Sequence, residues 1–259
     1  MSLNFALLDD NVSTAFERSR WRGGMYMLSK FLKRYSEISE ISTMLEFGIG
    51  GGGKQILWAD FMAEVPDSIS IGVEIFSPLT EFPEGMHDDN FQWHMKGYEC
   101  STGQFAKYQG KIFPFYGYNT YSEKTVDTIK DFLGDRLIDI IIDDSDANTA
   151  IKHPDKYDLS KLWSPLLKEN GFIWSETING QGTPGAQNLP IEEHRRVHEE
   201  FAELGWVIMD STKFSNPTKL RSREIPTNSF MALYAEDHSV YSDVYEKFED
   251  CIISGKYNI

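Results

Sequence analysis

An acid and several glycines stand together where the apolar run 44–47 ends. Gly48 follows Glu46 by two positions, and residues 50–53 are four consecutive glycines. Glycine takes positive φ readily and lets a ligand approach the main chain closely. Residues 54–58 look like a helix start, whose first amide groups would point at that ligand. The stretch therefore predicts a nucleotide-binding turn between a strand and a helix. The residues expected at the ligand are Glu46, Gly48, Gly50 and Gly52.

A second acid, Glu74, ends the next apolar run, about twenty residues past the glycines. An acid in this place can accept hydrogen bonds from both hydroxyls of a ribose, so we predict that Glu74 binds the cofactor ribose. The glycines alone fit NAD, FAD or S-adenosyl-L-methionine, since all three use a strand, a glycine turn and a helix. The dinucleotide pattern GxGxxG is also met, at positions 48, 50 and 53.

More acids follow the most apolar run of the chain, 137–142, which predicts a central parallel strand covered on both faces. They are Asp143, Asp144 and Asp146. The carboxyl ends of central strands are where α/β enzymes keep their chemistry. Like charges so close stay ionised most easily beside a cation, either a divalent metal or a cofactor sulfonium. Glu176, at the end of the next strand, is expected to face Asp144 across one cleft. The alternative is a solvated turn that caps the next helix.

Two further features each have an alternative interpretation. Tyr118 and Asn119 follow the strand predicted at 112–119, where Tyr118 could stack on adenine and Asn119 could bond its edge. A surface turn is the alternative. His194 and His198 are spaced to bind zinc on one face of a helix, but the neighbouring arginines and acids favour a solvated face.

Composition limits the function classes. The 259 residues, 41% of them hydrophobic, suit one α/β domain with additions. A net charge of −15 works against nucleic-acid binding and favours a small-molecule substrate. No apolar run is long enough for a membrane span and no secretion signal is recognised, so a cytoplasmic location is expected. The two cysteines, Cys100 and Cys251, suit reduced thiols. A homo-oligomer is left open.

Basic residues concentrate in one connection of this acidic chain. They are Lys213, Lys219, Arg221 and Arg223. They could hold an anionic group of the substrate, although an exposed loop needs no such reason to be basic.

The elements that position these residues alternate between strand and helix. Helices are expected at 13–35, 122–133, 154–167 and 191–204, and strands at 44–47, 69–75, 112–119, 137–142, 171–177, 206–209 and 230–234. The last two strands predict a closing antiparallel hairpin. The prediction is a Rossmann-like α/β fold, a mixed seven-stranded sheet with helices on both faces. Residues 1–40 are expected to form an N-terminal helical segment and 41–259 the cofactor-binding domain.

Four segments resemble class I S-adenosyl-L-methionine-dependent methyltransferases: LEFGIGGGG with its ExGxGxG spacing, ILWADFM before IGVEI, DIIIDDS and LLKENGFIWSE. More narrowly, the stretch 44–180 resembles the macrocin and mycinamicin type of metal-dependent sugar O-methyltransferases. The resemblance implies methyl transfer from S-adenosyl-L-methionine to a sugar or natural-product hydroxyl, with Asp143 on the cofactor side.

The resemblance also implies a magnesium ion, with Asp144 and Glu176 matching the metal positions. The family's histidine falls on Ala147 and its last acid on Thr177. Asp146 is therefore expected as a replacement ligand, and His153 as the base beside Asp144. Two alternatives stay open: an NAD-dependent oxidoreductase with Glu74 on the ribose, and a non-catalytic S-adenosyl-L-methionine binder.

Overall fold

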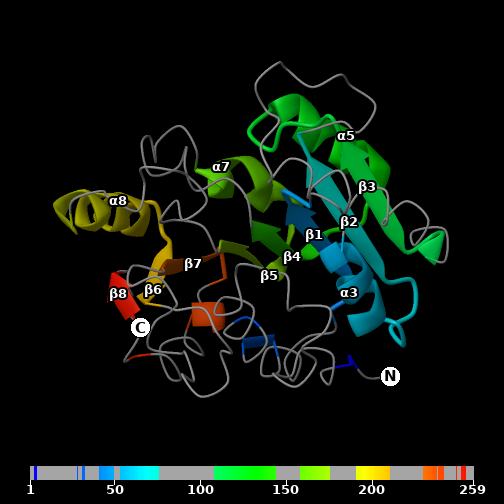
Figure 1. The fold of residues 1–259 in the computed structure, drawn as a ribbon, viewed down its shortest axis with the longest axis horizontal. Helices are drawn as coiled ribbons and strands as arrows, with labels where there is room; N and C mark the ends of the chain where they lie inside the picture. Colours follow the sequence, from blue (N-terminus) through cyan, green and yellow to red (C-terminus); the bar gives the residue numbers. More distant parts are fainter. Residues whose placement is uncertain are drawn as a thin grey trace, which may run out of the picture.

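The structure is a computed structural model, drawn as a ribbon in Figure 1. It describes residues 3–4, 28, 31–32, 41–49, 53–75, 108–143, 158–175, 191–210, 230–237, 239–241, 249 and 252–254. Within these ranges no helix is long and apolar enough to cross a membrane.

A mixed sheet forms the centre of the molecule (Figure 1). Its parallel part contains β1 (Thr43–Phe47), β2 (Ile69–Glu74), β3 (Ile112–Tyr116), β4 (Ile138–Asp143) and β5 (Leu167–Ser175). The other strands are β6 (Val207–Asp210), β7 (Phe230–Ala235) and the short β8 (Ile252–Ser254). The order is β3-β2-β1-β4-β5-β7-β6-β8.

Strand β7 lies between β5 and β6 and is antiparallel to both. This confirms the predicted antiparallel hairpin and the predicted Rossmann-like mixed sheet, whose seven expected strands are all present. Strand β8, which was not predicted, extends the edge by pairing with β6.

Helices cover both faces of the sheet (Figure 1). One face packs on α3 (Gly53–Phe61), and the other on α5 (Glu123–Leu133), α7 (Leu159–Trp163) and α8 (Ile191–Glu203). Alternation along β1 directs Met44 to the α3 face and Leu45 to the opposite face, because successive side chains of a strand point to opposite sides. Both faces are apolar, as expected for buried parallel strands.

Five residues of the N-terminal segment are described, and the first two, Leu3 and Asn4, are not helical. Leu28, Phe31 and Leu32 are helical, buried and part of the core on the α3 face. Phe31 packs edge-on against Phe172 and stacks on Trp174, with ring centroids 4.9 and 5.8 Å away. The segment is therefore helical at residues 28, 31 and 32 and not at residues 3–4, and its boundary at residue 40 stays a prediction.

The predicted helix at 154–167 is wrong at its carboxyl end. Helix α7 ends at Trp163, a 3₁₀ turn (η3) spans Ser164–Leu166, and β5 already begins at Leu167. Pro165 lies in that turn and has no N–H to continue a helix. Leu167 instead pairs with Ile138 of β4, so the strand predicted from 171 starts four positions earlier.

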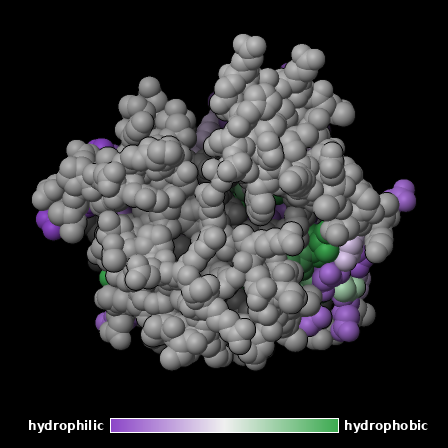
Figure 2. Space-filling view, in the orientation of Figure 1, coloured by the Kyte–Doolittle hydropathy of each residue, from purple (hydrophilic) through white to green (hydrophobic). Residues whose placement is uncertain are grey.

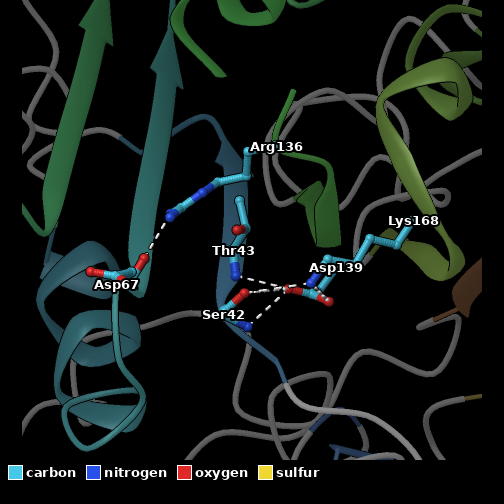
Figure 3. Close-up of polar contacts among 6 residues, drawn as sticks. All are labelled: Ser42, Thr43, Asp67, Arg136, Asp139 and Lys168. Atoms are coloured by element: carbon cyan, nitrogen blue, oxygen red, sulfur yellow. Dashed lines mark hydrogen bonds and ion pairs between the residues drawn. The ribbon is translucent and has the colours of Figure 1, made fainter. Parts of the chain in front are cut away.

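A buried acid fastens the amino end of the sheet, away from the predicted site (Figure 3). Asp139 Oδ2 accepts hydrogen bonds from the backbone N–H groups of Ser42 and Thr43, at 2.8 and 2.9 Å. Asp139 Oδ1 forms an ion pair with Lys168 Nζ at 2.6 Å. Nearby, Arg136 donates to the carbonyl of Asp67 at 2.7 Å. The bonds to Asp139 satisfy a carboxylate that would be costly to bury unpaired.

Candidate cofactor site

The carboxyl ends of the parallel strands meet at one edge of the sheet. Phe47 of β1 is paired with Val73 of β2 and with Asp143 of β4, and Asp143 is paired with Ser175 of β5. In an open α/β sheet, ligands bind outside this edge at the point where the strand order reverses. Here the reversal falls between β1 and β4, because β2 follows β1 on one side and β4 lies on the other.

Gly48 begins the turn after β1. Its φ is 66°, in the left-handed region that favours glycine, and its N–H donates to Val73 O at 2.8 Å. Gly50 and Gly52 lie outside the described residues. The predicted change from strand to helix is confirmed, since α3 begins at Gly53.

Gly72 was not singled out from the sequence, yet it supports this turn. A Cβ at position 72 would lie 2.5 Å from Cδ1 and 2.9 Å from Cγ2 of Ile49, and 3.2 Å from Cδ of Gln55. The side chain of Ile49 therefore packs directly on the backbone of β2 at Gly72, where any larger residue would clash with it. The signal in the sequence was the glycine itself, inside an otherwise apolar strand.

Glu46 is 1% exposed, on the α3 face of β1. Its Oε2 accepts hydrogen bonds from Gln55 Nε2 and Trp58 Nε1 of α3, both at 3.0 Å. Gln55 Oε1 in turn accepts from Ser70 Oγ of β2 at 2.7 Å. A polar network thus joins two strands to the first turns of the helix that follows the glycines.

Glu74 ends β2, as predicted, and is buried at 7% exposure. Its carbonyl accepts from the N–H groups of Gly117 and Tyr118, at 2.7 and 3.0 Å, so the turn after β3 is held against it. Gly117 has φ of 83°, which lets the chain reverse there. An acid fixed at this edge fits the hydroxyls of a ribose.

Tyr118 and Asn119 lie in that turn. The ring of Tyr118 packs edge-on against Phe115, with centroids 5.7 Å apart. Asn119 Oδ1 accepts from Tyr121 N–H at 2.9 Å and so shapes the turn ahead of α5. The structure therefore places Tyr118 against the backbone of Glu74, with Asn119 next to it in the same turn. Their contact with adenine stays a prediction.

Asp143 ends β4 and is buried at 4% exposure. Its Oδ2 accepts from Ser175 Oγ at the end of β5, at 3.0 Å. The side chain of Asp143 points to the same face of the sheet as Ile141, two positions earlier, and this face is covered by α5 and α7. The side chain of Glu74 points to the α3 face, because Val73 before it points to the opposite one. The two acids thus stand on opposite sides of the sheet edge. Ser175 was not predicted as a site residue, because its partner is 32 positions away.

The remaining predicted site residues lie outside the described residues. They are Asp144, Asp146, His153 and Glu176. Among the residues that the structure does describe, no group of three or more His, Cys, Asp or Glu side chains is placed to hold a metal. The predicted magnesium site therefore stays a prediction.

The solvated face predicted around the α8 histidines is wrong for His198, which is buried at 4% exposure. Arg195 and Arg196 of the same helix are exposed, and Arg196 pairs with Glu200 one turn later. Figure 2 shows hydrophilic residues at the outer end of α8. His198 instead lies on the inner side of an amphipathic helix.

No protein-family model matches the sequence, and no curated protein matches it. Several solved structures are similar. A TDP-rhamnose 3'-O-methyltransferase of calicheamicin biosynthesis has 15% identity, with 90% of this chain and 86% of that chain covered and a TM-score of 0.41. An O-methyltransferase from Bacillus cereus has 13% identity, with 89% and 91% covered and a TM-score of 0.40. A plantazolicin methyltransferase has 10% identity, with 88% of each chain covered and a TM-score of 0.44.

Proposed function

We propose that this chain is an S-adenosyl-L-methionine-dependent methyltransferase that methylates a hydroxyl of a small molecule, of the sugar or natural-product class. The observation that carries the proposal is the strand order β3-β2-β1-β4-β5-β7-β6 with β7 antiparallel, together with Gly48 and Glu74 at its carboxyl edge.

The same strand order argues against an NAD-dependent oxidoreductase. The dinucleotide-binding fold places its strands in the order 3-2-1-4-5-6, mostly parallel and built from two similar halves. Here the second half is broken by β7, which inserts antiparallel between β5 and β6. Glu74 could bind the ribose of NAD or of S-adenosyl-L-methionine, so this acid does not distinguish the two functions. The order and direction of the strands do.

The residues at the edge fit S-adenosyl-L-methionine. When bound, it supplies a methyl group on a positively charged sulfur. Glu74 would accept hydrogen bonds from the ribose hydroxyls, and the backbone at Gly48 would admit the cofactor closely. Alignment of a substrate oxygen with that methyl group would provide much of the rate enhancement.

The finer parts of the proposal rest on the sequence alone. Asp144 and Glu176 would hold a divalent ion that lowers the pKa of the substrate hydroxyl. His153 would take the hydroxyl proton, and the basic connection 213–223 would hold an anionic group of the substrate. The acidic chain, with its net charge of −15, supports a small molecule over a nucleic acid.

Methyl transfer is tested by incubating the purified chain with S-adenosyl-L-methionine labelled in its methyl group and a panel of sugar and natural-product alcohols. The expected result is a labelled methyl ether and an equal amount of S-adenosyl-L-homocysteine. If the protein binds S-adenosyl-L-homocysteine but yields no methylated product with any alcohol of the panel, the proposed O-methylation is contradicted and the non-catalytic binder is favoured.

A further inference from the structure

We propose that Glu46 is a positioning residue, which fixes the glycine turn through α3 and does not contact the cofactor. The inference rests on the proposed function, because it concerns how the cofactor turn is held. The motif ExGxGxG alone would place this acid at the ligand, whereas the structure gives it different partners.

The first observation is the direction of the Glu46 carboxylate. Oε2 accepts from Gln55 and Trp58, which lie in the first and second turns of α3. One acceptor thus binds donors on two successive turns of α3, and this pair of bonds holds the helix start on β1. Both donors and the acid itself are buried, which keeps water from competing.

The second observation is that the network reaches the next strand. Ser70 donates to Gln55, and the Gln55 side chain lies beside the space above Gly72 that Ile49 fills. Ile49 belongs to the turn itself, between Gly48 and the glycines that precede α3. The turn is therefore anchored at both ends: by Gly48 on β2, and by α3 on Glu46.

A fixed turn matters because binding a cofactor to a mobile turn costs the conformational entropy of ordering it. Removing the network should therefore weaken cofactor binding even though Glu46 is intact. A carboxylate that contacted the cofactor would add its own contribution, so replacing Glu46 would then weaken binding more than replacing Gln55.

The test measures the Kd of S-adenosyl-L-homocysteine by calorimetry at a temperature where every variant is folded. Gln55→Met keeps the side-chain volume and removes both hydrogen bonds of the amide. We expect it to weaken binding at least about fivefold, which corresponds to losing one typical hydrogen bond. Ser70→Ala, a milder change, should weaken binding in the same direction and serves if Gln55→Met does not fold.

Asp139→Asn is the matched control. Asp139 is also a buried acid that binds backbone and side-chain donors on a neighbouring element, but at the opposite end of the sheet. It should lower the Tm and leave the Kd within about twofold of the wild type. A change in Kd as large as that of Gln55→Met would show that binding follows general stability, and would overturn the inference.

Two other results are decisive. If folded Gln55→Met and Ser70→Ala bind like the wild type while Glu46→Gln binds more weakly, Glu46 contacts the cofactor directly and the inference is wrong. If the wild type itself does not bind S-adenosyl-L-homocysteine, the proposed function fails, and the inference fails with it.

Discussion

At the carboxyl edge of the sheet, Glu74 and Asp143 lie on opposite faces. Glu74 ends β2 on the α3 side, and Asp143 ends β4 on the side of α5 and α7. A cofactor lying across the edge would meet one acid on each side. Asp143 is already bonded to Ser175, whereas the backbone of Glu74 is bonded to the turn that carries Tyr118.

At the residue scale, Glu74→Ala should weaken S-adenosyl-L-homocysteine binding at least about tenfold, because hydrogen bonds to a charged partner contribute roughly 1.5–3 kcal/mol. Calorimetry on the folded variant measures the change. The backbone bonds from Gly117 and Tyr118 to residue 74 remain in this variant, so the turn should keep its shape. Unchanged affinity would show that Glu74 does not bind the cofactor.

The metal is a second question at this scale. Asp144, Asp146 and Glu176 offer hard oxygen ligands that suit magnesium, which needs only one or two carboxylates and keeps several waters. We expect methyl transfer to fall after exhaustive chelation and to return with magnesium in the wild type, but not in Asp144→Asn. Full activity of the metal-free wild type would show that these acids serve the substrate or the sulfonium directly.

The spacing of residues along the chain predicted that Gly48 begins a turn and that Glu74 ends a strand, because each position depends only on its own strand and turn. Gln55, Trp58, Gly72 and Ser175 were not predicted as site residues. Their roles depend on contacts between elements, such as the bonds from α3 to Glu46 or from β5 to β4. Such contacts depend on the packing of a helix on a sheet, which residue spacing does not specify.

At the element scale, Gly72→Ala should displace the glycine turn. The added methyl group would lie 2.5 Å from Ile49 Cδ1, so Ile49 must move. Overpacking of this kind costs typically about 1–3 kcal/mol of stability. We expect a lower Tm and weaker binding of S-adenosyl-L-homocysteine.

Gly171→Ala is a suitable comparison for that variant. Its new Cβ would lie 2.9 Å from the carbonyl oxygen of Ile138 and 3.0 Å from the backbone of Lys168, near the start of β5. It should lower the Tm without changing cofactor affinity, because it lies away from the carboxyl edge. Equal affinities of folded Gly72→Ala and the wild type would show that Ile49 does not support the binding turn.

The connection between β6 and β7 carries the basic residues of the second half of the chain. Replacing Arg221 and Arg223 with glutamine should raise the KM of an anionic substrate, because its charge loses its partners, and should leave cofactor affinity unchanged. Steady-state kinetics with an anionic and a neutral substrate separate the two effects. The same KM for the anionic substrate in wild type and variant would contradict this role.

Element boundaries show where pattern reasoning succeeds and fails. Helix α5 begins within one residue of its prediction, because Ser122 stands before an amphipathic run and Gly134 after it. Strand β5 begins four residues early, because Leu167 pairs with Ile138 across a register shift. Such a shift depends on the neighbouring strand and leaves little trace in the local sequence.

At the scale of the whole molecule, the strand order carries the functional conclusion. The alternation of strands and helices predicted a doubly wound sheet, and the final two strands predicted its antiparallel hairpin. The insertion of β7 between β5 and β6 departs from the dinucleotide-binding arrangement. Strand β8 could not be predicted, since it is only three residues long and pairs across a register shift with β6.

The most direct test of the central claim is calorimetry of the wild-type chain with S-adenosyl-L-homocysteine and, in parallel, with NAD. We predict one-to-one binding of S-adenosyl-L-homocysteine and no detectable heat with NAD, because the edge beside Glu74 belongs to a sheet completed by antiparallel β7. Saturable NAD binding without binding of S-adenosyl-L-homocysteine would contradict the proposal.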